Sequence, residues 1–442
     1  MRQSADMRTR PASLLRQRKF ALLWAGQSAS VFGTEITFVA VPLTAVLVLD
    51  ATPMEAGVLR ALETVPFLLF GLFVGVLLDR RARRSVMIVA DVVRAAALAW
   101  IPIAYALDVL TIAQLFVVVF VLGVMTVFFD LAYQSYLPGL VGRDRLTEAN
   151  GKLQLSASGA QVAGPGAAGL LIAWLGAPVA LAVDAMTYVI SFFTVARLPA
   201  DEVAKAQPDV PAASVGAAIR EGISVLWRHP LLRWCTTAAV IINLFSAVVM
   251  SLFFLFLVQE VGIGAAQVGL VVAAGSVGAL AGSMMVGRLS RWFGDGPAII
   301  VSMALSTLGY LLVALAPAKS SAAFAVAALG SFIALFGVPV FNVLVVSLRQ
   351  ISTPDELLGR VNATARTCIW GAASAGALLG GAFASVAGLR EAVLVGAAGT
   401  FLAALVLLFS PVRAVRDLHA TATGHGPAAE PRTGPTDQEQ TP

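Results

Sequence analysis

The sequence predicts an all-α membrane protein of twelve transmembrane helices arranged as two six-helix bundles, with both chain termini in the cytoplasm. Three observations support this: few charged residues, a series of apolar blocks, and residue types that recur between the two halves. Of the 442 residues, 58% are hydrophobic and 12% are charged, whereas soluble domains carry about 25% charged residues. A chain with so few polar groups is expected to face mostly lipid.

The apolar blocks have the length of membrane-spanning helices, which need about 20 mostly apolar residues each. They cover 20–49, 55–78, 85–107, 109–135, 153–175, 178–197, 231–258, 266–287, 297–317, 321–347, 362–386 and 391–411. The first block follows Arg16, Arg18 and Lys19, as the core of a signal peptide would. A signal core has about 7–15 apolar residues. Because this block is longer, we expect a retained helix.

The basic residues predict the orientation, since cytoplasmic connections are enriched in Lys and Arg. Successive connections between the spans lie alternately on the two sides of the membrane. Those on one side, together with both termini and the stretch 198–230, carry most of the Lys and Arg residues. The connections on the other side hold little beyond Lys319 and Arg390. We therefore expect a multi-pass protein of the inner (cytoplasmic) membrane with both termini inside the cell. The net charge of +5 is then a topology signal and does not predict nucleic-acid binding.

The two halves of the chain share residue types at a constant offset of 212 positions. The matching pairs are Gly75 and Gly287, Phe129 and Phe341, Asn150 and Asn362, Gly164 and Gly376, and Gly169 and Gly381. Two six-helix repeats of parallel topology are typical of secondary transporters, whose substrate site lies between the repeats near the middle of the membrane.

The predicted domains follow from this repeat. We expect an N-terminal six-helix bundle over 1–198 and a C-terminal six-helix bundle over 231–412. Between them, 199–230 is a cytoplasmic linker in which apolar residues at helical spacing predict an amphipathic helix on the membrane surface. The segment 413–442, rich in Pro, Gly, Thr and Gln, is expected to be a disordered cytoplasmic tail.

Several chemistries lack the residues that they require. The two cysteines, Cys235 and Cys368, lie in separate apolar blocks and form no disulfide framework or metal-ligand spacing. Gly151 and Lys152 are followed by leucine and lack the glycine pattern of a phosphate-binding loop. We therefore expect no metal, no cofactor and no enzymatic activity, and any active transport should be secondary.

Charged residues inside the apolar blocks are the main candidates for function. A charge at the bilayer centre costs about 2.5–3.5 kcal/mol, so such residues usually face a cavity or a partner. Glu35 lies near the middle of the first predicted helix without a basic neighbour three or four positions away. Glu63 lies nearer the outer side, with Arg60 one turn away, and Asp184 is ambiguous. These four residues are the candidates for proton coupling and substrate binding; the alternative is a structural hydrogen bond to a neighbouring helix.

Other residues of the apolar blocks have simpler interpretations. Asp91 and Arg94 are three positions apart on one helix face, where they are expected to neutralise each other. The candidates for lining a cavity, each of which is as well explained by helix packing, are Trp24, Gln27, Phe38, Gln134 and Asn243.

The connection GVLLDRRARR, from Gly75 to Arg84, resembles the signature loop of the major facilitator superfamily. Ala82 stands where that pattern usually has a second glycine. The resemblance implies that Asp79 faces the positive N-terminus of a helix from the other half, near residue 362, and closes the cytoplasmic side. The alternative is an ordinary basic cytoplasmic loop. The expected latch consists of Gly75, Asp79, Arg80, Arg83, Arg84 and Asp130.

The segment SGAQVAGPGAAG, residues 158–169, resembles the antiporter motif of the drug-exporting branch. Gly164, Pro165 and Gly169 match that motif, and Ala168 replaces one of its glycines. Close packing of small residues is the alternative explanation. Further passages, such as DAMTYVISF and STPDELLGRVNA, extend the resemblance over residues 14–411, to the branch that contains macrolide-efflux and enterobactin-exporter proteins.

This resemblance implies a secondary active transporter that exports hydrophobic or amphiphilic small molecules, such as a drug, a macrolide-like product or a siderophore. Proton antiport and alternating access would drive it. Its partners would be the small molecule, protons and the lipid bilayer, and the chain is expected to be monomeric. Two alternatives remain open: a proton-coupled importer of a small nutrient, and a non-transporting membrane sensor or scaffold.

Overall fold

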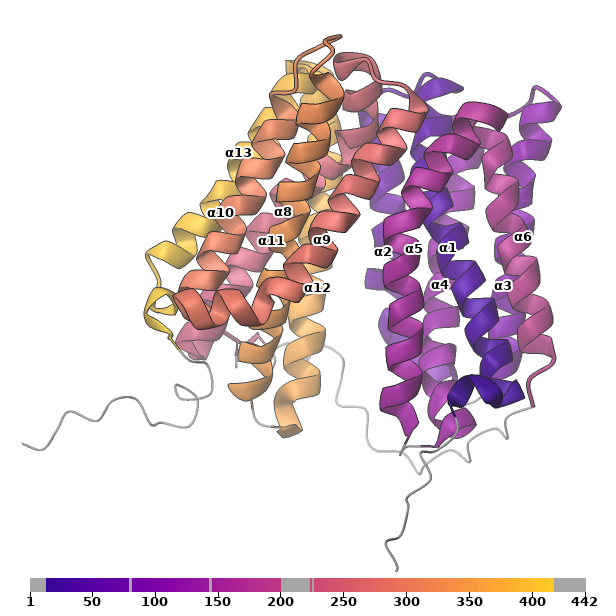
Figure 1. Ribbon diagram of the computed structural model, residues 1–442, viewed down its shortest axis with the longest axis horizontal. Coiled ribbons are helices and arrows are strands. Elements are labelled where there is room, and N and C mark those ends of the chain that lie inside the picture. Colours follow the sequence, from indigo (N-terminus) through magenta and orange to yellow (C-terminus); the bar gives the residue numbers. More distant parts are fainter. Residues whose placement is uncertain are drawn as a thin grey trace, which may run out of the picture.

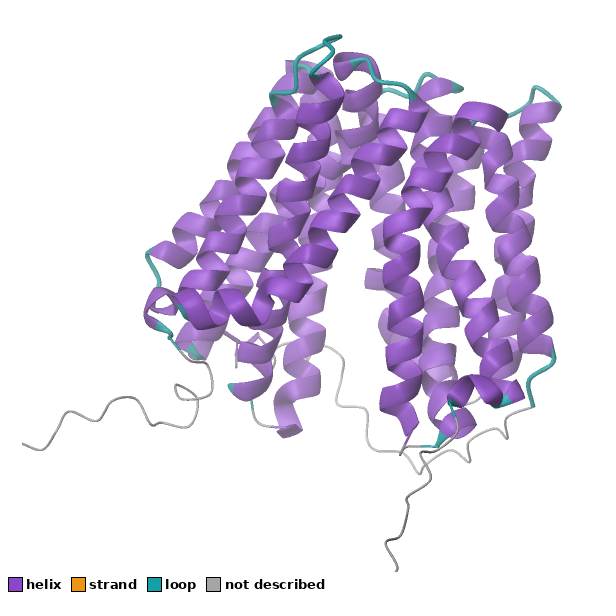
Figure 2. Ribbon diagram, viewed as in Figure 1, coloured by secondary structure: helices purple, strands orange, loops and turns teal. Residues whose placement is uncertain are grey.

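The computed structural model describes residues 13–78, 82–142, 145–199, 223–224, 226–353 and 355–416, with the side chains of 71–78 and of 355, 356 and 358–360 outside that description. Within these residues the chain forms twelve α-helices of 20 residues or more and no strand (Figure 2). The helices are α1 (Arg18–Leu47), α2 (Pro53–Leu78), α3 (Arg83–Ala106), α4 (Ile112–Val141), α5 (Leu146–Leu175), α6 (Ala177–Ala196), α8 (Pro230–Leu255), α9 (Ala265–Phe293), α10 (Asp295–Ala314), α11 (Ala323–Ile351), α12 (Asp355–Ala387) and α13 (Leu389–Leu408).

Ten helical segments of the described part are long and apolar enough to cross a membrane, and α2 and α5 are not among them. The helices α1–α6 form one half of the molecule, and α8–α13 form the other (Figure 1). We call the lower end in Figure 1 the basic end. Among the helix ends that lie there, Arg16 comes just before α1, Arg83 begins α3, Arg145 precedes α5, and Arg291 and Arg349 belong to the last turns of α9 and α11. The opposite end is called the far end.

The helices follow the order of the predicted spans, but several extend further at the basic end. Helix α5 begins at Leu146, whereas the predicted span began at 153, and α12 begins at Asp355 where 362 was predicted. Polar side chains support these extra turns of helix. In α5, Glu148 lies 2.6 Å from Arg145 and 3.8 Å from Lys152, at the spacing of helical ion pairs. An apolar-block criterion misses such turns because they lie beyond the hydrocarbon layer.

The buried apolar residues show how the two halves meet. One core occupies the far-end part of both halves and includes Leu43 and Leu59 from one half and Leu252 and Val268 from the other. At the basic end there are two separate cores: one contains residues from the N-terminal half, and the other contains residues from the C-terminal half. The ribbons of the halves accordingly lie together at the far end and apart at the basic end (Figure 1).

Two helix crossings join the halves near the far end, and glycine makes both possible. A methyl group at Gly57 of α2 would lie 2.5 Å from the Ala377 carbonyl oxygen of α12, and one at Gly269 of α9 would lie 2.5 Å from the Pro165 carbonyl oxygen of α5. Each crossing places two glycines together, Gly57 with Gly381 and Gly269 with Gly169.

The two crossings are related by the 212-residue offset that the sequence shows. Gly269 is 212 positions after Gly57, and Gly381 is 212 positions after Gly169. The residue whose carbonyl limits each crossing obeys the same shift, since Ala377 is 212 positions after Pro165. The internal repeat is therefore a structural pseudo-symmetry that builds both of these crossings.

Candidate functional site

A pocket of about 230 Å³ lies between the halves, on the basic-end side of the α2/α12 crossing. Helices α2 and α4 form it from one half, and α12 forms it from the other. Its walls combine aromatic, aliphatic and charged side chains. The lining residues are Phe67, Leu68, Val127, Asp130, Leu131, Gln134, Ala363, Arg366, Thr367 and Trp370.

The inner wall of this pocket is a contact between α2 and α12. The rings of Phe67 and Trp370 stack with centroids 5.3 Å apart and planes inclined by 23°. One turn toward the far end, the hydroxyl groups of Thr64 and Ser374 are hydrogen-bonded at 2.8 Å, and both residues are buried. The pocket is thus closed toward the far end by an aromatic pair backed by a buried polar pair.

Two opposite charges line the same pocket from different halves. Asp130 comes from α4 and Arg366 from α12, and Arg366 is exposed within the opening. Within the described residues neither side chain has a hydrogen bond or an ion pair, although Asp130 interacts electrostatically with Arg94. Both charges are therefore available to a molecule that enters the pocket, or to each other if the halves approach.

Glu35 lies against the motif that resembles the antiporter signature. A methyl group at Gly164 of α5 would lie 2.5 Å from the Glu35 Cβ of α1. The carboxylate-bearing turn of α1 therefore packs directly on Gly164, and only glycine fits there without a shift. Glu35 is partly buried and, within the described part of the chain, has no hydrogen bond or ion pair. The structure thus brings together two features that the sequence shows 129 positions apart.

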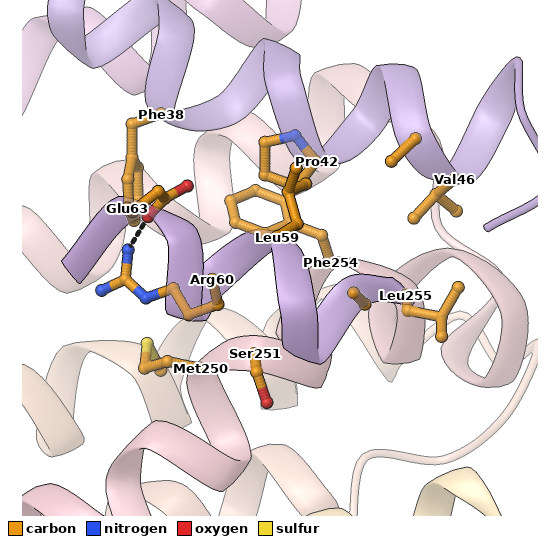
Figure 3. A pocket seen from close by; sticks show the side chains of 12 residues that line it. Phe38, Pro42, Val46, Leu59, Arg60, Glu63, Met250, Ser251, Phe254 and Leu255 are labelled. Carbon is orange, nitrogen blue, oxygen red and sulfur yellow. Dashed lines mark hydrogen bonds and ion pairs between the residues drawn. The ribbon is translucent and has the colours of Figure 1, made fainter. Parts of the chain in front are cut away.

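Arg60 and Glu63 form an ion pair at the far-end side of the interface (Figure 3). They line a slot of about 30 Å³ between α1, α2 and α8. The Arg60 guanidinium lies 5.8 Å from the centre of the Phe38 ring, which meets the Phe254 ring edge-on at 5.8 Å. Such a volume holds about one or two water molecules. The pair is therefore partly buried beside the packed part of the interface.

Several other predicted residues lie outside these pockets. The Trp24 indole donates to the Lys152 carbonyl oxygen at 3.4 Å, and the Asn243 amide donates to the Ala239 carbonyl oxygen of its own helix at 2.8 Å. Gln27, like these two, lines neither of the pockets described above. Phe38 lines the Arg60–Glu63 slot, and Gln134 lines the larger pocket.

Much of the predicted latch lies outside the described residues. Asp79 and Arg80 are outside them, and Gly75 lies in the part of α2 whose side chains are not described. Arg84 donates hydrogen bonds to the carbonyl oxygens of Val195 and Ala196 at the end of α6, and Arg83 also has an interaction partner. Asp130 lines the pocket between the halves. The latch stays a prediction.

Phe67, Arg366 and Trp370 are not among the site residues predicted from the sequence. A signal was present for two of them. Arg366 is the only charged side chain of α12 between 361 and 387, and Trp370 is the largest side chain in a helix otherwise rich in Gly, Ala and Ser. Their position at the interface depends on α2 meeting α12, which no local pattern shows.

At the basic end, Glu148 ties the start of the chain to α5. Its Oε1 accepts a hydrogen bond from the Leu14 backbone N–H at 3.0 Å, and its Oε2 accepts one from Arg145 at 2.6 Å. The Leu14 N–H and then the Arg145 guanidinium lower the pKa of Glu148. The short 3₁₀ helix η1 (Leu14–Arg16) is therefore fixed beside α5 by an ionised carboxylate.

Comparison with known proteins shows the family of the chain. The family model described as a transmembrane secretion effector, of the major facilitator superfamily, matches residues 9–435. The chain belongs to this family. The predictions of the superfamily and of an all-helical fold are confirmed.

Relatives of known activity match along nearly the whole chain. The chain is 26% identical over 404 residues to the multidrug efflux pump Tap of Mycolicibacterium fortuitum, covering 89% of this chain and 94% of that one. It is 24% identical to macrolide efflux protein A of Streptococcus pyogenes, covering 90% and 97%. It is 26% identical to the enterobactin exporter EntS of Salmonella choleraesuis, covering 88% and 91%.

Solved structures share the fold. A crystal structure of the nucleoside transporter NupG superposes with a TM-score of 0.67 at 11% identity and covers 89% of this chain and 98% of that one. A bacterial homologue of the iron transporter ferroportin, in an inward-facing state, superposes with a TM-score of 0.67 at 17% identity, covering 90% and 98%. The likeness shows that the chain shares the fold of these proteins.

Proposed function

We propose that this protein is a secondary transporter that exports amphiphilic small molecules by alternating access, in exchange for protons. The observation that carries the proposal is the distribution of the apolar cores. A single core joins the halves at the far end, whereas two separate cores leave a pocket between the halves toward the basic end. A protein that opens alternately to the two sides of a membrane requires such an interface, packed at one end only.

The basic end is the side from which substrate enters. Lys and Arg collect on the cytoplasmic side of membrane proteins, so the end that carries Arg16, Arg83 and Arg349 faces the cytoplasm. The conformation described here is then open to the cytoplasm and closed to the outside. The protein would lie in the cell membrane of a bacterium, as expected for a relative of bacterial efflux pumps.

The pocket indicates the class of substrate. Phe67 and Trp370 offer flat apolar surfaces, Asp130 offers a negative charge, and Arg366 and Gln134 add polar contacts at the opening. Apolar pockets with a few placed polar groups suit bulky ligands with one polar end. The names of the relatives, which include a multidrug pump and a macrolide efflux protein, support the same class.

Glu35 is our candidate for the carboxylate that couples export to protons. It lies in the apolar middle of α1, has no hydrogen bond or ion pair within the described residues, and packs on Gly164. A carboxylate in such a place favours its neutral form and binds a proton readily. A cationic substrate in the cavity favours the ionised form. Competition between proton and substrate would then produce antiport.

Proton movement in inverted membrane vesicles tests this proposal. The vesicle lumen is acidified, tetraphenylphosphonium or a macrolide is added outside, and a pH-sensitive dye follows the lumenal pH. We expect wild-type vesicles to release lumenal protons when the compound is added, and Glu35→Gln vesicles to lose this response. Glu391→Gln, which neutralises an exposed carboxylate at the far end, is the matched control and should respond as the wild type does.

Other outcomes separate the alternatives. If wild type and Glu35→Gln respond alike, export is retained but Glu35 is structural, and the Arg60–Glu63 pair becomes the coupling candidate. If no compound releases protons while cells accumulate a radiolabelled nutrient through the protein, transport runs inward and the export proposal is wrong. A protein without any flux in either assay would be a sensor or scaffold.

A further inference from the structure

Four charged residues meet inside the N-terminal half, away from the pocket wall formed by α12. We call them the Arg94 cluster: Asp91 and Arg94 of α3, Asp130 of α4 and Asp184 of α6. The Arg94 Nη2 lies 2.5 Å from the Asp91 Oδ1, and the same guanidinium interacts electrostatically with Asp130 and Asp184. One carboxyl group is thus paired with the guanidinium, and two more from other helices lie within its electrostatic reach.

Hydroxyl groups and aromatic rings complete the surroundings of the cluster. Asp91 accepts a hydrogen bond from Ser191 at 2.7 Å. Asp184 accepts one from Thr187 at 2.7 Å and another from Thr37. The Arg94 guanidinium lies between two rings, 4.3 Å from the centres of Phe129 and Tyr188. The Arg94 Nε is buried and has no hydrogen-bond partner.

The charges in this cluster do not balance. Asp91 and Asp184 are 0% exposed and Arg94 is 3% exposed. With all three carboxylates ionised beside one guanidinium, two negative charges would be uncompensated, and at least that of Asp184 would lie away from water. Moving one such ion into a low-dielectric interior is unfavourable even after relaxation, and a buried carboxyl group avoids this cost by taking up a proton.

No other described group balances the cluster. Arg94 is the only cation, within the described part of the chain, that acts electrostatically on each of the three carboxyl groups. The ionisable groups that face it from α4 and α6 are Tyr133 and Tyr188, which carry no positive charge. On α1 the ionisable group nearby is Glu35, another acid, and α5 has none between 153 and 175.

The cluster has an opening to water and a contact with α1. Asp130 lines the pocket between the halves, so one of its carboxyl groups meets the cytoplasmic opening. At the other side, a methyl group at Gly33 would lie 2.1 Å from the Asp184 Oδ1, so Asp184 lies against the α1 backbone two residues before Glu35. The Thr37–Asp184 hydrogen bond joins the same helix to the cluster.

We propose that the Arg94 cluster is a proton-binding site, separate from Glu35, that fills and empties through Asp130. Uptake forms an O–H bond on one of the three carboxyl groups and breaks an O–H bond of a hydronium ion in the pocket. Release is the reverse, with water as the acceptor. Gain or loss of a proton on Asp184 changes the contact between Asp184 and α1. This contact links the cluster to the helix that carries Glu35. The proton-binding site itself does not depend on the proposed function; only its link to Glu35 during transport rests on it.

Infrared spectroscopy of the purified full-length protein in nanodiscs tests the proposal without any substrate. Protonated carboxyl groups absorb apart from carboxylates, and their band shifts in D₂O, which the ester band of the lipids does not. The Glu35→Gln variant serves as the background, so that Glu35 contributes nothing. We expect this variant to show a protonated-carboxyl band at neutral pH, and the band to shift when the aspartates carry ¹³C.

The Asp130→Asn/Asp184→Asn double variant in the same background is the decisive comparison. It retains the neutral Asp91–Arg94 pair, which favours correct folding, and its folding is checked by size-exclusion chromatography. We expect it to lose the band, whereas Glu63→Gln, which acts on the separate Arg60–Glu63 pair, should keep it. Absence of the band from Glu35→Gln at neutral pH, or its persistence in the double variant, would overturn the proposal. Neither result depends on transport.

Discussion

At the scale of single residues, a glycine determines where the candidate coupling carboxylate, Glu35, can lie. Gly164 leaves the space that the Glu35 side chain occupies, since a methyl group there would come within 2.5 Å of the Glu35 Cβ. The sequence analysis predicted both residues as functional but treated them separately. It could not place them together, because contact between α1 and α5 depends on the packing of the whole half.

A pair of glycine substitutions tests this contact. Gly164→Ala is expected to displace Glu35 or α5, because overpacking costs about 1–3 kcal/mol. Such a cost corresponds to a loss of roughly 5–150-fold in an equilibrium, so substrate-driven proton release should fall strongly. Gly166→Ala is the matched control, since its new methyl group would meet only the Ala273 Cβ at 3.9 Å. Equal activity of both variants would contradict the importance of this contact.

The acid stability of the chain offers a second test at this scale. Folding lowers the pKa of Glu148. The ionised carboxylate therefore stabilises the folded state at pH values above the pKa that Glu148 has in the unfolded chain. This contribution is lost as the pH falls through the lowered pKa of the folded state. Glu148→Gln should therefore lower the melting temperature by a few degrees at most at neutral pH. In acid the two proteins should melt alike, as measured by scanning fluorimetry. If the melting temperatures of the two proteins differed by the same amount at every pH, the ionised carboxylate could not be the cause of the difference.

At the scale of helices, the repeat explains how the halves hold each other. The sequence predicts the twelve spans in order and the 212-residue offset, because apolar length and residue spacing are local properties. Nothing in the sequence indicates that this offset relates two helix crossings, that of α2 with α12 and that of α5 with α9. The stack of Phe67 on Trp370 joins positions 303 residues apart and was missed for the same reason.

Alanine at the crossing glycines is expected to loosen the far end. Gly57→Ala and Gly269→Ala each place a methyl group 2.5 Å from a carbonyl oxygen of the opposite half, so the closed far end should lose about 1–3 kcal/mol. By pseudo-symmetry the two variants should have similar effects. Gly371→Ala, whose methyl group meets nothing within 4 Å, is the control. The readout is the labelling rate of a cysteine introduced at Leu59, and unchanged rates in both variants would contradict the role of the crossings.

At the scale of the whole molecule, the two halves differ in what they carry. The Arg94 cluster, Glu35 and the Arg60–Glu63 pair all belong to the N-terminal half, whereas the C-terminal half contributes Arg366 and the aromatic ring of Trp370 to the pocket. Composition predicts this asymmetry, because the intramembrane charges concentrate in the first half of the sequence. The halves would then move relative to each other at the symmetric crossings, and the charged N-terminal half would bind the protons.

The central claim is that the two ends of this interface open in turn. The most direct measurement is a pair of spin-label distances in a protein whose native cysteines have been replaced. One pair, at Gly151 and Gly287, spans the basic end, where a side chain at either position meets nothing within 4 Å. The other, at Leu107 and Leu315, spans the far end, where both residues are more than 60% exposed. On adding tetraphenylphosphonium, we predict that the far-end distance lengthens as the basic-end distance shortens. Distances that change in the same direction, or that both stay fixed, would contradict alternating access.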